Sequence, residues 1–243
     1  MIIPQEVDKA PDAAVFCQVQ SELGTVQDLD ALFERLPGAC RIVDAVQAAG
    51  KLELYPGADV WIISGAKLGA PGGAAALLDA KGRFTEKLLT YAKKYRHENY
   101  AAGRIPAAAA LTLVYAAERC MARRESEYER IVSLRRMVTE ACAGWHAFPT
   151  VPDGAEVSPY ILNILLEHQQ SAIVVRALSE RGIYTASGSA CSAESGEPSA
   201  ALLALKRSRD EAYRALRISF GAATTAEDVK IFLFELENVL KNY

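Results

Sequence analysis

Short apolar runs in the first half of the chain constrain the fold more than any other feature of the sequence. Residues 13–19 (AAVFCQV), 41–46 (RIVDAV) and 60–63 (VWII) are continuously apolar rather than alternating, and a helical pattern at 26–36 separates the first two. Strands covered on both sides have this composition, because neither side meets water. The strand–helix–strand order predicts an α/β fold, a mostly parallel sheet with helices on both faces.

The second half of the chain alternates shorter strands and helices. Apolar strand segments at 160–166 and 215–220 flank an amphipathic helix at 170–181. This pattern predicts a smaller α+β arrangement. We therefore expect a large domain with an incomplete sheet over 1–140 and a small C-terminal domain over 141–243.

Composition excludes several classes of function. The net charge of −3 argues against binding to nucleic acid or to a membrane surface. No apolar run is long enough to span a bilayer, and the first residues lack the basic start and apolar core of a signal peptide. The 5 cysteines include no CxxC pair, so neither a metal site nor a disulfide framework is expected. We expect a cytoplasmic protein with reduced thiols.

A single cysteine, Cys191, lies in a stretch of small and polar residues, 187–199 (SGSACSAESGEPS). Glycine and proline in this stretch disfavour both a buried strand and a helix, so the segment is predicted to be a loop that presents a thiol. Taken alone, the loop is explained more simply as a linker with an incidental cysteine. Its meaning depends on what the rest of the chain carries.

Polar residues follow two of the predicted strands. Lys67 and Ser64 come at the end of the 60–63 strand, and Asp44 and Gln47 at the end of the strand before it. Ligands bind where parallel strands end. A neutral lysine can form a Schiff base with an aldehyde cofactor, a serine can bind a phosphate, and an aspartate can hold the proton of a pyridinium nitrogen. Each residue alone is more often simply solvated.

Together these segments resemble the cysteine desulfurases, pyridoxal phosphate (PLP) enzymes of aminotransferase class V. The similar segments, in the order of the family's motifs, are 22–28 (ELGTVQD), 43–47 (VDAVQ), 64–72 (SGAKLGAPG), 161–163 (ILN), 187–199 and 216–225 (LRISFGAATT). The resemblance covers nearly the whole chain. It implies a partial fold-type-I PLP-dependent transferase that lacks the N-terminal third of the family's length.

The resemblance also implies roles for individual residues. Lys67 would hold PLP covalently, and Cys191 would take sulfur from L-cysteine as a persulfide and release alanine. The other implied contacts are Asp44 to the pyridinium nitrogen, Gln47 to the phenolic oxygen, Ser64 to the phosphate, Ser21 to the cofactor and Arg217 to the substrate carboxylate.

The chain departs from the family's pattern in places that bear on function. Ala66 stands where the family has a histidine, and Ser21 where it has an asparagine. None of His97, His146 and His168 fits the role of the histidine that stacks on the cofactor. The missing N-terminal third would leave sheet edges unpaired. We therefore expect a separate polypeptide that supplies this portion, pairing of such units into a dimer, and a sulfur-acceptor protein.

The sequence leaves alternatives open. The leading hypothesis is the C-terminal part of a split cysteine desulfurase. A catalytically inactive paralogue that acts as a binding or regulatory subunit is the alternative, and a selenocysteine lyase or another class V enzyme is a third. Whether the sulfur would serve iron–sulfur clusters, thiolated RNA or another pathway also stays open.

Overall fold

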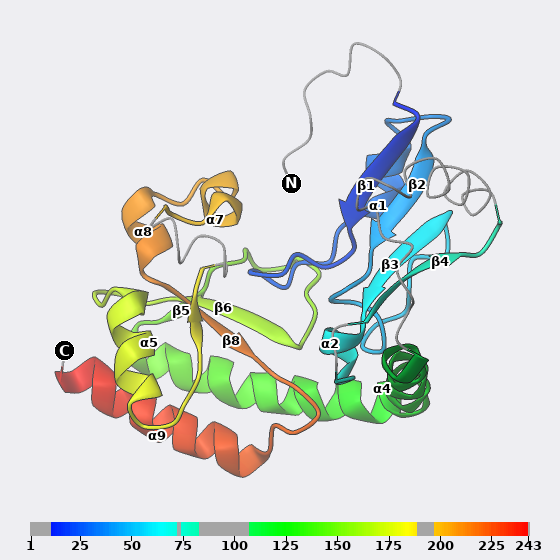
Figure 1. Cartoon of the computed structure of the whole chain (residues 1–243). Coiled ribbons are helices and arrows are strands. Elements are labelled where there is room, and N and C mark those ends of the chain that lie inside the picture. Colours follow the sequence, from blue (N-terminus) through cyan, green and yellow to red (C-terminus); the bar gives the residue numbers. More distant parts are fainter. Residues whose placement is uncertain (1–10, 72–73, 83–106, 189–196, 243) are drawn as a thin grey trace, which may run out of the picture. The chain divides into compact units, whose positions relative to one another are not determined.

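The chain forms two compact units, shown in Figure 1. The computed structural model describes residues 11–71, 74–82, 107–188 and 197–242. The N-terminal unit consists of the described residues of Ile3–Val19 and Gln27–Arg124, and the C-terminal unit of Gln20–Val26 and Glu125–Tyr243. The division of the chain into domains 1–140 and 141–243 stays a prediction.

The N-terminal unit contains a four-stranded sheet in the order β1-β2-β3-β4. Its elements are β1 (Ala13–Cys17), α1 (Leu29–Phe33), β2 (Cys40–Asp44), β3 (Val60–Ser64), α2 (Gly65–Leu68) and β4 (Ala75–Asp79). Strands β1, β2 and β3 are parallel, and β4 is an antiparallel edge strand. The prediction of a mostly parallel sheet is confirmed.

Apolar side chains remain exposed on both edge strands of this sheet. The centre is buried, with Val43 and Val60 at 0% and 1% exposure, but Val15 on β1 is 57% exposed. On β4, Leu77 and Leu78 are 47% and 40% exposed. Apolar runs of this kind normally meet a cover on both sides, and these positions lack one within the described residues.

The C-terminal unit contains an antiparallel sheet in the order β5-β6-β8-β7. Its strands are β5 (Phe148–Pro149), β6 (Ile161–Leu165), β7 (Ala186–Ser187) and β8 (Ala215–Ser219). Its helices are the second half of α4 (Ala107–Cys142), the 3-10 turn η1 (Ala143–Trp145), α5 (Ser171–Ser179), α7 (Ala200–Ala204), α8 (Arg209–Tyr213) and α9 (Ala226–Asn242). This agrees with the α+β arrangement expected of the second half.

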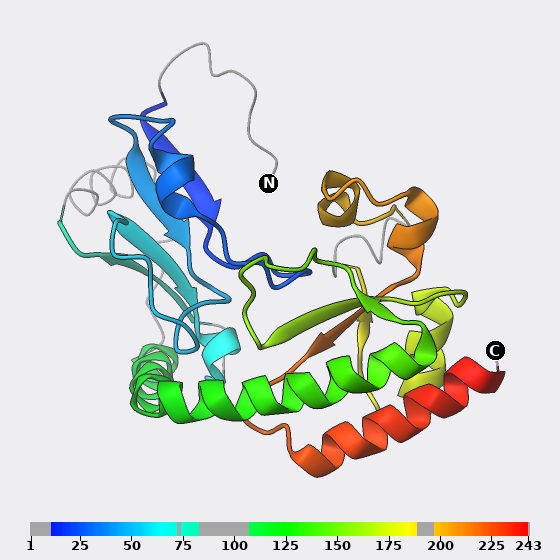
Figure 2. The same ribbon diagram turned by 180° about the vertical axis from the view of Figure 1, so that it is seen from behind.

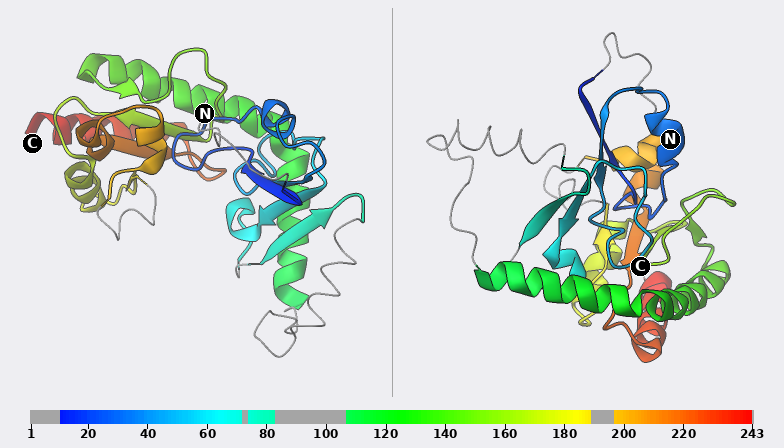
Figure 3. Two further views of the ribbon diagram at one scale, coloured as in Figure 1. Left: turned by 90° about the horizontal axis from the view of Figure 1, so that it is seen from above. Right: turned by 90° about the vertical axis from the view of Figure 1, so that its right-hand side faces the viewer.

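The two faces of this sheet pack against different helices. Figures 2 and 3 show α9 running beside the second half of α4. On their face of the sheet, Leu162 of β6 and Leu216 of β8 join a core with residues of α4, α5 and α9. On the other face, Ala215 of β8 clusters with Leu23, Leu202 and residues of α8. Side chains alternate along a strand, so Arg217 shares the face of Ala215.

Residues 20–26 form a tight turn that packs on the C-terminal sheet unit. The Gln20 side chain accepts hydrogen bonds from the backbone nitrogens of Glu22 and Leu23, at 2.6 Å each. Thr25 forms a β-bridge with Val157, and the nitrogen of Ser158 donates to the Gly24 carbonyl at 2.8 Å. Gly24 has φ +76°, and a Cβ there would lie 2.7 Å from the Ile161 carbonyl oxygen. Only glycine fits this contact.

Substituting Gly24 tests how tightly this turn is packed. Gly24→Ala should lower the free energy of unfolding by more than Gly154→Ala, because both positions have positive φ but only Gly24 lacks space for a Cβ. The positive φ costs ~1–2 kcal/mol in either variant, and overpacking adds ~1–3 kcal/mol in Gly24→Ala alone. Urea unfolding of the two variants measures the difference, and equal losses would contradict the packing described.

Candidate functional site

Asp44 and Ser64 lie at the same edge of the N-terminal sheet. Asp44 ends β2, Ser64 ends β3, and the two strands are parallel with Asp44 opposite Ile62. Asp44 Oδ1 accepts a hydrogen bond from the nitrogen of Val46 at 3.0 Å. Its Oδ2 accepts none from the residues that the structure describes. Both residues therefore lie at the carboxyl edge of the parallel strands, with Ser64 two residues beyond the position opposite Asp44.

A compact turn after β2 carries Gln47. The nitrogens of Ala48 and Ala49 donate to the Ala45 carbonyl, so the chain curls back directly behind Asp44. Gly50 then adopts φ +69°, and a Cβ there would lie 2.6 Å from the Cβ of Cys120 and 2.8 Å from Leu68. The turn is thus held against both α2 and α4.

Lys51 completes this turn and contacts the predicted site residue. Its Nζ donates to Gln47 Oε1 at 3.3 Å. The pKa of Lys51 is lowered to about 8, mainly because the amine is buried and further because Lys67 is close, while Cys120 acts in the opposite direction. Sequence reasoning missed Lys51. Its spacing of four residues from Gln47 is the one signal that could have found it.

Lys67 lies in α2, a single helical turn that follows β3 directly. Gly69 ends the turn with φ +80°. Gly65 begins it, where a Cβ would lie 2.9 Å from the Ala74 carbonyl oxygen. The Ser64 side chain makes no capping hydrogen bond. Both Ala66 and Lys67 are exposed, so the lysine amine is open to a ligand.

The donor set at this sheet edge fits the groups of PLP. Two amines lie near one another, Lys67 exposed and Lys51 half-buried, and both favour an anionic ligand. The open oxygen of Asp44 suits a protonated ring nitrogen, and an exposed amine suits an aldehyde. The residues present are therefore compatible with the cofactor, although Ala66 contributes no polar group.

Ser21 and Arg217 form a separate group within the C-terminal unit. Arg217 lies on β8 between Asn163 of β6 and Ala186 of β7, and its Nη1 donates to the Ser21 carbonyl at 3.3 Å. Asn163 Nδ2 donates to the Glu22 carbonyl at 3.2 Å. The buried Nε of Arg217 has no hydrogen-bond partner among the described residues. A guanidinium with an unused donor suits a carboxylate ligand.

The remaining predicted site residue, Cys191, lies outside the described residues. The described chain stops at Gly188, just after β7, and resumes at Glu197, where Ser199 Oγ caps α7 by accepting from the nitrogen of Leu202 at 3.2 Å. The structure therefore brings together Asp44, Gln47, Ser64 and Lys67 in one unit, and Ser21 and Arg217 in the other.

Two of the described cysteines, Cys17 and Cys142, are not activated thiols. Burial raises the pKa of Cys142 to about 11. Burial also raises the pKa of Cys17, and the carboxylate of Asp44, beside it in the neighbouring strand, raises it further. A thiol is a nucleophile only when it loses its proton. These two side chains are held in the unreactive form.

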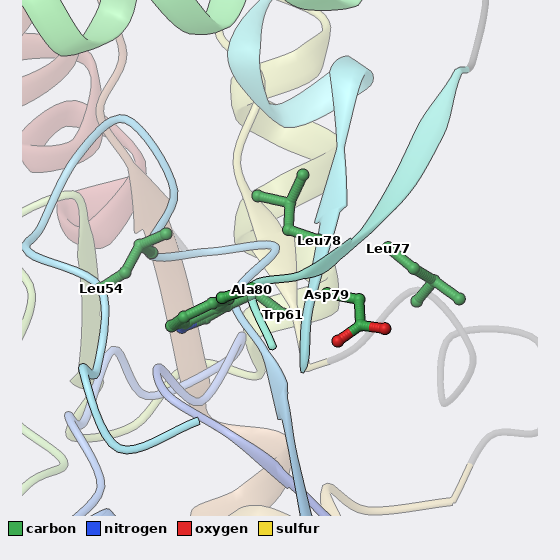
Figure 4. Close-up of a pocket in the computed structure, with 6 residues that line it drawn as sticks. All are labelled: Leu54, Trp61, Leu77, Leu78, Asp79 and Ala80. Atoms are coloured by element: carbon green, nitrogen blue, oxygen red, sulfur yellow. The ribbon is translucent and has the colours of Figure 1, made fainter. Parts of the chain in front are cut away.

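An apolar pocket of about 570 Å³ lies on the N-terminal sheet (Figure 4). Trp61 and Leu78 are opposite one another in the β3–β4 pairing and line it together with Leu54, Leu77, Asp79 and Ala80. None of the predicted cofactor residues contributes to it. It is a feature of the exposed edge, separate from the Asp44–Lys67 group.

The described part of the chain contains neither a cluster of metal ligands nor a membrane-spanning helix. Within residues 11–71, 74–82, 107–188 and 197–242, no group of at least three acidic, cysteine or histidine side chains is placed to hold a metal ion. In the same ranges, no helix has the length and apolar character needed to cross a bilayer.

Comparison with known proteins gives a consistent family. A NifS/IcsS protein homolog of Lactobacillus delbrueckii subsp. bulgaricus is 25% identical over 247 residues, covering 98% of this chain and 63% of its own length. The cysteine desulfurase IscS of Methylococcus capsulatus is 31% identical over 225 residues, covering 87% of this chain and 53% of its own length. The chain thus spans little more than half of these relatives.

Structural comparison agrees with the sequence match. The solved structure of a NifS-like protein superimposes with a TM-score of 0.78 at 19% identity, over 98% of this chain and 63% of that one. This likeness establishes the fold-type-I architecture. The sequence profile described as "Aminotransferase class-V" matches residues 2–232. Since that match covers nearly the whole chain, the protein belongs to the class V aminotransferase family.

Proposed function

We propose that this chain is the C-terminal part of a split, PLP-dependent cysteine desulfurase. The observation that carries the proposal is the group at the carboxyl edge of β2 and β3, where Asp44, Gln47 and Ser64 accompany the exposed amine of Lys67. The cysteine desulfurases among its relatives support the reaction class. The thiol of Cys191, in a segment of small residues, supplies the sulfur acceptor that a plain transaminase does not need.

Each residue of the sheet-edge group has a defined task in this proposal. Lys67 binds the cofactor aldehyde and moves protons at its Nζ. The Asp44 carboxylate holds the proton on the ring nitrogen, and Gln47 and Ser64 donate to the phenolic oxygen and the phosphate. When bound, PLP supplies an electron sink for the carbanion that forms on the amino acid.

The C-terminal residues handle the substrate. Arg217, whose Nε has no partner within the described part of the chain, binds the carboxylate of L-cysteine. The Cys191 thiolate attacks the substrate sulfur, so that an S–S bond forms while the bond between that sulfur and the substrate Cβ breaks. The electron pair left on Cβ takes a proton, and alanine leaves. The outer sulfur of the Cys191 persulfide then passes to an acceptor protein.

The proposal includes a separate polypeptide that covers the exposed sheet edges. Val15 on β1 and Leu77 on β4 are 57% and 47% exposed, and the apolar pocket around Trp61 and Leu78 lies on the same sheet. Two of the relatives have additional length that this chain does not span, since it covers 63% and 53% of them. We infer that a second chain supplies it, and that such units pair into dimers. Co-purification of this chain with that polypeptide from its native host tests the inference.

An inactive paralogue with a binding or regulatory role is the second candidate. Ala66 offers no phosphate ligand at an exposed position beside Lys67, and the exposed Ser21 side chain is shorter than the family's asparagine. These two substitutions favour it. The retained set of Lys67, Asp44 and Arg217 favours the enzyme, and cofactor binding separates the two.

Substituting Lys67 tests cofactor attachment. Adding PLP to the chain, alone and with its partner polypeptide, should produce a visible absorption band that Lys67→Ala abolishes, because the amine that bonds to the aldehyde is gone. Lys230→Ala, at an exposed position on α9, is the control and should keep the band. A band that persists unchanged in Lys67→Ala would refute attachment at this residue.

Substituting Cys191 tests sulfur transfer independently of cofactor binding. Cys191→Ser should reduce alanine and sulfide formation from L-cysteine to background, because a hydroxyl cannot accept the sulfur, while the absorption band remains. Cys40→Ser, on β2, is the control and should retain activity. Sulfide release that survives Cys191→Ser would rule out the persulfide role. A loaded chain with no activity at all would favour the regulatory candidate.

A further inference from the structure

Lys51 is a half-buried amine at the candidate site to which the family's motifs assign no task. It belongs to the turn that follows β2, and its backbone nitrogen donates to the Ala48 carbonyl at 2.9 Å. Its Nζ lies 3.3 Å from Gln47 Oε1. The preceding residue, Gly50, packs so closely on Cys120 and Leu68 that a Cβ there would lie 2.6 Å and 2.8 Å from their side chains. The position of Lys51 is therefore built into the fold.

We propose that Lys51 is a positioning residue, whose ammonium fixes the orientation of the Gln47 amide so that Nε2 faces the bound ligand. The inference rests on the proposed function, since the ligand in question is PLP. It assigns Lys51 no contact with the reacting atoms. Lys51 acts entirely through Gln47.

The chemistry of the two side chains determines this orientation. A lysine ammonium has three donors and no acceptor, whereas a glutamine amide has an acceptor at one end and a donor at the other. Lys51 can therefore pair only with Oε1, and a rotated amide would set its NH₂ group against the ammonium. With Oε1 held by Lys51, Nε2 is directed to the remaining side, where a ligand oxygen such as the phenolic oxygen can accept from it.

The electrostatic surroundings indicate that Lys51 serves the site rather than the stability of the fold. Burial and the amine of Lys67 on α2 both disfavour its charge, and Cys120 on α4 offsets them only in part, which leaves a pKa of about 8. An exposed lysine would keep the ordinary pKa of its amine. A cation that loses hydration destabilises the folded state unless its partners compensate fully, and the pKa of Lys51 stays lowered although its Nζ donates to Gln47.

Cofactor binding in single and double variants tests the inference. PLP is titrated into wild type, Lys51→Met, Gln47→Ala and the double variant, and both the dissociation constant and the position of the visible band are measured. We expect Lys51→Met to weaken binding about 10- to 150-fold, as loss of one hydrogen bond to a charged group does, and to move the band in the same direction as Gln47→Ala. The double variant should be no worse than Gln47→Ala, because Lys51 acts only through that amide.

Conservative replacement separates positioning from a merely structural role. Lys51→Arg, which also offers only donors, should restore the band position, whereas Lys51→Met should not. Additive losses in the double variant would mean that Lys51 contacts the ligand directly, and would overturn the inference. Unchanged binding and band in Lys51→Met would overturn it as well. If wild type itself binds no PLP, the proposed function is wrong, and the inference about Lys51 is overturned with it.

The pH dependence of unfolding gives an independent check that needs no ligand. Between about pH 8 and pH 10.5 the unfolded chain keeps the Lys51 proton while the folded chain releases it, so folded wild type gains stability as the pH rises. Lys51→Met should therefore have a higher urea midpoint than wild type at pH 7, and this advantage should shrink across that interval. Lys230→Met is the exposed control. A pH-independent difference would show that the Lys51 amine is not buried as described.

Discussion

The parallel pairing of β2 with β3 is the constraint on which the candidate site depends. Parallel neighbours end at the same edge of a sheet, so Asp44 and Ser64 both lie at this edge, although the chain between them is long enough to form a complete turn and loop. Each strand leads directly into a short local structure: β2 into the turn at 45–52, and β3 into the one-turn helix α2. These structures carry Gln47 and Lys67. The pairing of two strands, with the two short segments that follow them, thus determines where Asp44, Ser64, Gln47 and Lys67 lie.

Much of this arrangement is predictable from the sequence. Continuous apolar runs identify β2 and β3 as covered parallel strands, and the polar residues that follow them must then share an edge. Lys51 is different, because its approach to Gln47 depends on how the turn closes against Cys120, about 70 residues further along the chain. Hydrophobic periodicity carries no information on such a contact. The apolar run at 73–78 predicts the strand β4, but not its antiparallel direction, since an apolar edge strand has the same sequence pattern in either direction.

The group around Gln47 illustrates how a binding site can oppose stability. Two lysine amines near one another, one of them half-buried, repel each other in the absence of an anion. In the proposed site an anionic ligand would relieve that repulsion, so part of its binding energy would come from removing it. The same reasoning applies to the Nε of Arg217, which is desolvated before any carboxylate arrives.

The turn formed by residues 20–26 has a consequence for how the chain folds. Its contacts with β6 and β8 join residues 141 and 196 positions apart, those of Asn163 with Glu22 and of Arg217 with Ser21. Closing loops of that length is slow, because its entropic cost comes before any of the stabilising long-range contacts has formed. The C-terminal unit therefore reaches its final form only after it has captured a segment synthesised long before it. During translation, the groups that hold Arg217 in place would be the last to assemble.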